Sequence, residues 1–147
     1  MIEQFEANPA NGPLIPEIRS IVADLEAGKT RDPASVTPVL QSLFSAGLQR
    51  YMIDLFSHDP VGLAKGWHGP ALIVQGDEDV QVRPHDADLL ESALPQARRM
   101  DLSGGTHMLK AVVPGRPYAT YTDRTLPLHD GLVPGIVAFI EWASPLR

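Results

Sequence analysis

A carboxylate and an imidazole each follow an apolar segment in the second half of the chain. Asp79 lies in "GDEDVQV", directly after the apolar run "PALIVQ", and His107 lies in "SGGTHM", after the segment "ARRMDL". The carboxyl ends of neighbouring parallel strands meet at one edge of a sheet, where α/β proteins bind ligands. If both segments are strands, Asp79 and His107 therefore lie together. An aspartate in that position holds a histidine in one tautomer and stabilises the imidazolium that forms during general-base catalysis.

The acidic turn allows other interpretations. Three neighbouring carboxylates, Asp77, Glu78 and Asp79, also fit a solvated loop with no catalytic role. Asp77 and Glu78 are expected to form a hydrogen-bonding turn, and Glu78 is the main alternative to Asp79 as the acid. The remaining histidines show no i, i+4 metal-ligand spacing and are expected at surface or capping positions: His58, His68, His85 and His129.

The elements that would position this pair begin at residue 70. The run "PALIVQG" is unbroken in its apolar character, which is typical of a strand buried on both faces of a parallel sheet. A helix is expected over 84–95, a weaker strand over 97–102 and a closing helix over 131–143. Strand, helix, strand and helix in this order predict a βαβα unit with two parallel strands, so the fold class is α/β.

The chain before residue 70 is expected to be helical. Apolar residues recur at helical spacing over 13–28, over 32–47 and over 48–56, and a short helical turn is expected over 58–66. In the second of these segments Asp32 is a candidate N-cap, with Pro33 at the first helical position. The predicted organisation is a helical segment, 1–69, followed by the α/β segment, 70–147.

Composition excludes several classes of function. The chain has 147 residues, 44% hydrophobic and 20% charged, as in ordinary globular proteins. The net charge of −6 argues against a nucleic-acid or anionic-membrane surface. The absence of cysteine excludes disulfides and thiolate zinc sites. No secretory signal pattern and no apolar run approaching the ~20 residues of a membrane span is found, so a cytoplasmic protein is expected.

The segment 70–112 resembles the C-terminal part of α/β-hydrolase-fold serine hydrolases. In that family a Gly-x-x-Asp turn after the penultimate strand bears the triad acid, and a histidine loop follows the last strand. Here Gly76 and Asp79 match the turn, and Gly105 and His107 match the loop. The resemblance implies that Asp79 is the triad acid and His107 the base, in the chain order of that family. It also implies that the helices of 1–69 are cap-like and that 70–147 is the C-terminal part of the hydrolase core.

The nucleophile of that family is missing. No Gly-x-Ser-x-Gly motif, the strand-to-helix turn that carries the serine, occurs in the chain, and no HGGG-like oxyanion segment does either. Ser103 lies in the same loop as His107 and lacks an elbow sequence. The resemblance therefore implies the acid/base half of an esterase- or lipase-like serine hydrolase. Such an enzyme acts on a small-molecule ester, thioester or amide, with no metal or organic cofactor.

Two parallel strands cannot cover the edges and faces of their own sheet, so a partner is expected. The expected partner is a complementary N-terminal hydrolase half, or a second copy that associates through the sheet edge. The alternative to an enzyme is a non-catalytic remnant or binding module that uses the cap helices and the open edge. The polar stretch 113–131 is predicted to be a surface loop near the site, with Tyr118 and Tyr121 as candidate substrate contacts.

Overall fold

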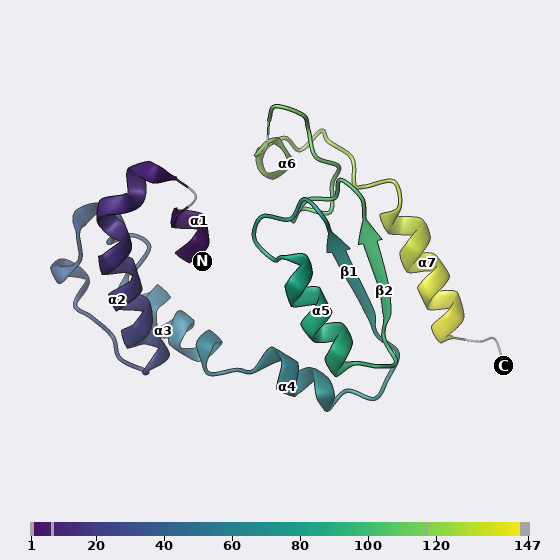
Figure 1. The fold of residues 1–147 in the computed structure, drawn as a ribbon, viewed down its shortest axis with the longest axis horizontal. Helices are drawn as coiled ribbons and strands as arrows, with labels where there is room; N and C mark the ends of the chain where they lie inside the picture. The colour runs from purple at the N-terminus through teal and green to yellow at the C-terminus, as the bar shows by residue number, and fades with distance from the viewer. Residues whose placement is uncertain (1, 7, 117, 145–147) are drawn as a thin grey trace. The chain divides into compact units, whose positions relative to one another are not determined.

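A computed structural model describes residues 2–6, 8–116 and 118–144 (Figure 1). Contacts within the chain divide it into two units, Met1–Asp59 and Pro60–Arg147. This boundary precedes the one expected at residue 69, because the short helix α4 (Pro60–Lys65) packs against helix α5 (Pro84–Ala93) and so belongs to the second unit.

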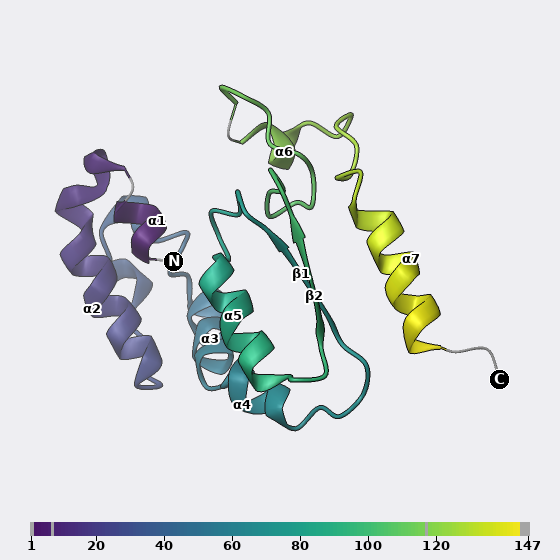
Figure 2. The ribbon, with the colours of Figure 1, turned by 45° about the vertical axis from the view of Figure 1, so that its right-hand side comes forward.

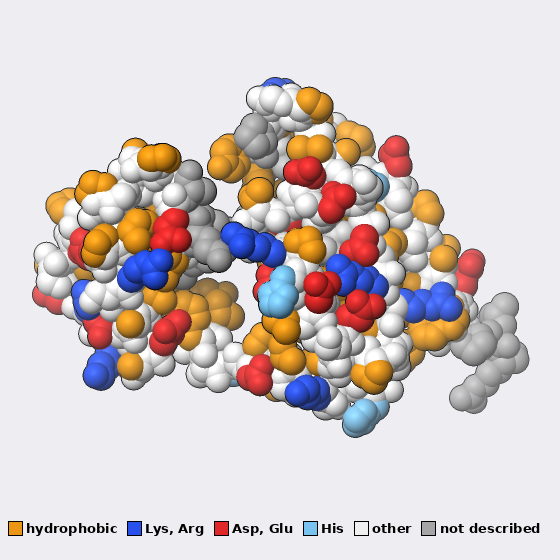
Figure 3. All heavy atoms as spheres, viewed as in Figure 1, with side chains coloured by type: hydrophobic (Ala, Val, Ile, Leu, Met, Phe, Trp, Pro, Cys, Tyr) orange, Lys and Arg blue, Asp and Glu red, His pale blue; other side chains and the backbone are white. Residues whose placement is uncertain are grey.

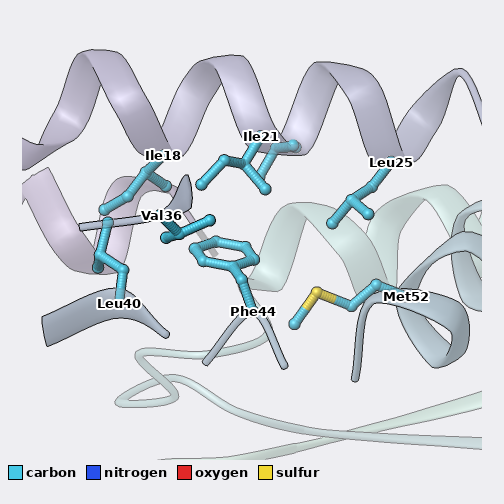
Figure 4. Close-up of a cluster of buried hydrophobic side chains, with 8 residues drawn as sticks. Ile18, Ile21, Leu25, Val36, Leu40, Phe44 and Met52 are labelled. Atoms are coloured by element: carbon cyan, nitrogen blue, oxygen red, sulfur yellow. The ribbon is translucent and has the colours of Figure 1, made fainter. Parts of the chain in front are cut away.

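The first unit is helical and has its own core. Its elements are α1 (Ile2–Glu6), the 3₁₀ helix η1 (Pro9–Leu14), α2 (Ile15–Glu26), the 3₁₀ turns η2 (Pro33–Ser35) and η3 (Pro38–Leu40), and α3 (Ala46–Phe56). The buried face of α2 meets apolar side chains of the following segments, and the ring of Phe44 lies among them (Figure 4). The core consists of Ile18, Ile21, Val22, Leu25, Val36, Leu40, Phe44 and Met52.

The helix predicted over 32–47 is wrong, although its cap is present. The Asp32 side chain accepts a hydrogen bond from the backbone N–H of Ala34 at 2.9 Å, as an N-cap does. The helix does not continue, because Pro38 has no N–H to donate and disfavours helical geometry at the residue before it. Thr37 accordingly has φ −47° and ψ 131°, and two 3₁₀ turns replace the helix.

The second unit confirms the mixed α/β class. Strand β1 (Leu72–Gly76) pairs in parallel with β2 (Arg98–Leu102), and α5 forms the crossover between them. The register places Leu72 opposite Arg98 and Gly76 opposite Leu102, so both strands end at the same edge. A short helix, α6 (Ala119–Thr122), interrupts the loop predicted over 113–131 and was not expected. The closing helix is α7 (Leu132–Ala143).

Helices α5 and α7 lie on opposite sides of the sheet (Figure 2). On one side, Arg99 of β2 forms ion pairs with Asp88 and Glu91 of α5. Hydrogen bonds from its guanidinium to Asp88, to Asp101 of β2 and to Glu91 raise the pKa of Arg99. On the other side, the side chain of Met100 lies against α7, where Gly135 has no Cβ atom and so leaves room for it. Each helix thus covers one face of the sheet.

None of the helices in the described ranges is long and apolar enough to cross a lipid bilayer. Hydrophobic side chains nevertheless reach the surface over α7 (Figure 3). Those of α7 that are exposed are Val133, Ile136, Val137, Ile140 and Trp142.

Candidate active site

The acidic turn begins where β1 ends. The backbone N–H of Asp79 donates to the carbonyl of Gly76 at 3.3 Å and closes a tight turn. Oδ1 of Asp79 then accepts two backbone hydrogen bonds, from Gln81 at 2.8 Å and Val82 at 2.9 Å. Because these bonds hold one oxygen, the orientation of the carboxylate is determined and its other oxygen, Oδ2, is free to take another partner.

The histidine loop begins where β2 ends and folds back on itself. The backbone N–H of Thr106 donates to the carbonyl of Lys110 at 2.9 Å, and the hydroxyl of Thr106 donates to the same oxygen at 3.0 Å. A second backbone hydrogen bond joins residues further apart in the sequence: the N–H of Val112 donates to the carbonyl of Gly104 at 2.7 Å and closes the base of the loop. His107 is therefore carried at the tip of a loop with both sides hydrogen-bonded.

The two loops bring Asp79 and His107 into contact. Oδ2 of Asp79 lies 3.0 Å from Nδ1 of His107. A carboxylate accepts hydrogen bonds and does not donate them, so the neutral imidazole carries its proton on Nδ1 and leaves Nε2 unprotonated. The Asp79 side chain is 9% exposed and the His107 side chain 36% exposed. The pair thus has a sheltered acid and a histidine whose ring remains reachable from solvent.

Hydrogen bonds from one side chain and from the backbone hold the two strand ends together. Oδ1 of Asp77 accepts a hydrogen bond from the N–H of Gly104 at 2.6 Å, and the N–H of Glu78 donates to the carbonyl of Gly105 at 3.0 Å. A Cβ atom at Gly76 would overlap the carbonyl oxygen of Gly105, and one at Gly105 would lie 3.2 Å from Cα of Gly76. The glycines of both motifs therefore permit the close approach that sets the spacing of acid and imidazole.

Among the three acidic residues, the structure brings Asp79 to the imidazole. Glu78 is exposed and contacts Gly105 through its backbone N–H, and the side chain of Asp77 accepts from Gly104, so both residues form hydrogen bonds at the turn. Ser103 is exposed in the loop before His107. The catalytic assignment of Asp79 and His107 stays a prediction from the sequence, and the contact it requires is present.

Helix α6 lies beside the acidic turn. The hydroxyl of Tyr121 accepts a hydrogen bond from the side-chain amide of Gln81 at 2.9 Å, and the ring of Tyr118 is 6.4 Å from that of Tyr121. Lys110 of the histidine loop donates to the carbonyl of Asp123 at 3.1 Å, just after α6. These contacts place both tyrosines near the site, and their role as substrate contacts stays a prediction.

His129 was expected at a surface or capping position, and the structure shows a wider role. Its Nδ1 accepts from the N–H of Gly131 at 3.1 Å, next to α7, and its Nε2 lies 3.0 Å from the carbonyl of Ser103. The sequence carries no signal for this contact, because His129 lies in an irregular loop far along the chain from Ser103.

No group of three or more histidine, aspartate or glutamate side chains gathers into a metal-binding arrangement within the ranges that the structure describes. Asp79 and His107 form a pair, and no further acidic or histidine ligand joins them there.

Comparisons with protein-family models, with curated proteins and with solved structures find no match to this chain. The functional assignment therefore depends on the residues and on the geometry of the site.

Proposed function

We propose that this chain is the acid/base half of a serine hydrolase, with the C-terminal portion of an α/β-hydrolase fold and a cap-like helical unit. The observation that carries the proposal is the 3.0 Å contact between Asp79 Oδ2 and His107 Nδ1. Two backbone N–H groups hold the other oxygen of Asp79, so the acid is oriented before any substrate arrives. Such a pre-oriented pair at adjoining strand ends is what general-base activation of a hydroxyl requires.

In the proposed reaction, the unprotonated Nε2 of His107 takes the proton of a serine hydroxyl supplied from outside this sequence. The serine oxygen attacks the carbonyl carbon of an ester, thioester or amide, and the imidazolium is stabilised by Asp79. His107 then gives the proton to the leaving group. Donors for the tetrahedral oxyanion must come from the same outside source as the serine, because they have to face the serine.

We also propose that the nucleophile-bearing half joins this chain at the sheet. Within the described ranges, β1 and β2 pair only with each other, so each strand has one unpaired edge. Ile73 and Gln75 of β1 are buried, as expected of a strand inside a larger sheet. An unpaired edge on a buried strand favours pairing with another strand.

The isolated chain is expected to self-associate or to be marginally folded, because its unpaired strand edges remain open. Static light scattering should give a mass above the 16.0 kDa of one chain, or thermal unfolding should be broad. A monodisperse monomer with a sharp, cooperative unfolding transition would contradict the half-domain proposal.

The isolated chain should hydrolyse p-nitrophenyl acetate no faster than free imidazole does, because nothing supplies a nucleophile or an oxyanion hole. A fluorophosphonate probe should leave it unlabelled. Joined to a half that carries Gly-x-Ser-x-Gly, such as one encoded in frame upstream of Met1, the chain should support both hydrolysis and labelling of that serine.

The chain alone serves as the control for the joined protein, because the same fluorophosphonate probe is applied to both. Stoichiometric labelling of a serine in the isolated chain would overturn the proposal, and Ser103 would be the first residue to map. A joined protein that takes up no probe would favour the alternative, a binding module without catalysis.

A further inference from the structure

His129 contacts the His107 loop at one residue before the imidazole of His107 and at one residue after it. Its ring Nε2 lies 3.0 Å from the carbonyl of Ser103, which precedes His107. Its backbone N–H donates to the carbonyl of Leu109, which follows His107, at 2.8 Å. One residue, distant along the chain, is thus bonded to both sides of the loop.

The partners of the His129 ring determine its tautomer. The carbonyl of Ser103 can only accept, so Nε2 must carry the proton. The backbone N–H of Gly131 can only donate, so Nδ1, at 3.1 Å from it, must be unprotonated. The proton of His129 therefore sits on Nε2, whereas that of His107 sits on Nδ1 opposite Asp79.

The loop has a specific need for such support. Leu109 has a φ of +54°, in the left-handed region that side-chain-bearing residues rarely adopt. A residue in that conformation persists only where its surroundings enforce it. The hydrogen bond from His129 to the carbonyl of Leu109, and that from the N–H of Leu109 to the carbonyl of Thr106 at 2.8 Å, act directly on this residue.

We propose that His129 is a positioning residue for His107, and that its Nε2–H tautomer holds the start of the histidine loop in the geometry that keeps His107 against Asp79. This inference rests on the proposed role of the Asp79–His107 pair. It adds that the orientation of His107 depends on a second histidine of opposite tautomer, which contacts the backbone of the His107 loop.

The first test needs no substitution. In the full chain with ¹⁵N-labelled histidine, long-range ¹H–¹⁵N correlation spectra show which ring nitrogen of each histidine is protonated. We expect His129 to carry its proton on Nε2 and His107 on Nδ1. A His129 protonated on Nδ1 would overturn the inference alone, whereas a His107 protonated on Nε2 would overturn the proposed pair.

The second test separates the two ring contacts of His129. In His129→Asn the side-chain oxygen still reaches the N–H of Gly131 two residues ahead, but no donor reaches Ser103. In His129→Gln the longer side chain places an amide N–H where Nε2 was. We expect the Nδ1 proton of His107 to exchange with water roughly five- to tenfold faster in His129→Asn, the effect of one lost hydrogen bond, and to recover in His129→Gln.

His85→Gln is the matched control, because His85 is an exposed residue of α5 and its substitution should leave the His107 proton unchanged. A residue that only stabilises the fold would lower the melting temperature without changing the exchange of the His107 proton. Unchanged exchange in His129→Asn, or an equal loss in His129→Asn and His129→Gln, would overturn the proposal. If neither variant folds, the tautomer of His129 in the unsubstituted chain decides.

Discussion

Substituting His107 with alanine should abolish hydrolysis in the protein joined to its nucleophile-bearing half, and Asp79→Asn should lower kcat by up to roughly 10⁴. The alanine variant removes the group that takes the proton of the serine. In the asparagine variant, the side-chain amide that replaces a carboxylate oxygen can donate to Nδ1, which favours the tautomer with the proton on Nε2. Nε2 of His107 then already carries a proton and cannot accept one from the serine.

Initial rates with p-nitrophenyl acetate, with fluorophosphonate labelling as a count of active serines, measure this effect. Glu78→Gln is the matched control, because Glu78 is a neighbouring acidic residue of the same turn whose side chain is exposed. Its kcat should stay at the value of the unsubstituted protein. A large loss in Glu78→Gln together with little change in Asp79→Asn would assign the acid to Glu78 and contradict the present assignment.

Phe44→Ala should destabilise the helical unit by about 3–5 kcal/mol, the usual cost of truncating a fully buried aromatic side chain. Phe44 is 0% exposed and lies in the cluster shown in Figure 4. A unit of about 60 residues has a small total free energy of unfolding, so this loss removes a large fraction of it. Far-ultraviolet circular dichroism followed through a urea titration should show the helical signal disappearing at lower urea concentration.

Val39→Ala is the control for this substitution. Val39 belongs to the same segment, but the residue is 67% exposed, so its truncation should change the unfolding free energy very little. Tryptophan fluorescence reports separately on the second unit, because Trp67 and Trp142 both belong to Pro60–Arg147. Equal midpoints for Phe44→Ala and Val39→Ala would contradict the assignment of Phe44 to the core.

Local sequence patterns predicted most of the elements. The unbroken apolar run before Gly76 predicted β1, and helical spacing predicted the helices that the structure places at 15–26, 46–56, 84–93 and 132–143. These patterns succeed because periodicity and burial act within a few residues of the chain. The helix expected over 32–47 failed for a local reason as well, since Pro38 interrupts a segment whose apolar spacing alone favoured a helix.

The sequence also predicted the contact between Asp79 and His107. Each residue follows a segment that was predicted to be a strand, and parallel strands joined by one helix end at the same edge of the sheet. What the sequence left open was the choice between neighbouring carboxylates. Glu78 and Asp79 differ in direction only after the turn from Gly76 closes and Asp79 is held by the backbone of Gln81 and Val82.

Only the tertiary structure decided how the strand ends are locked together. The bond between Asp77 and Gly104, the close approach of Gly76 to Gly105 and the contact of His129 with Ser103 all join residues far apart in sequence. Each depends on the register of two strands and on the path of the loop that returns to α7. Local sequence patterns do not predict such contacts, because strand register and loop path are set by the packing of the whole unit.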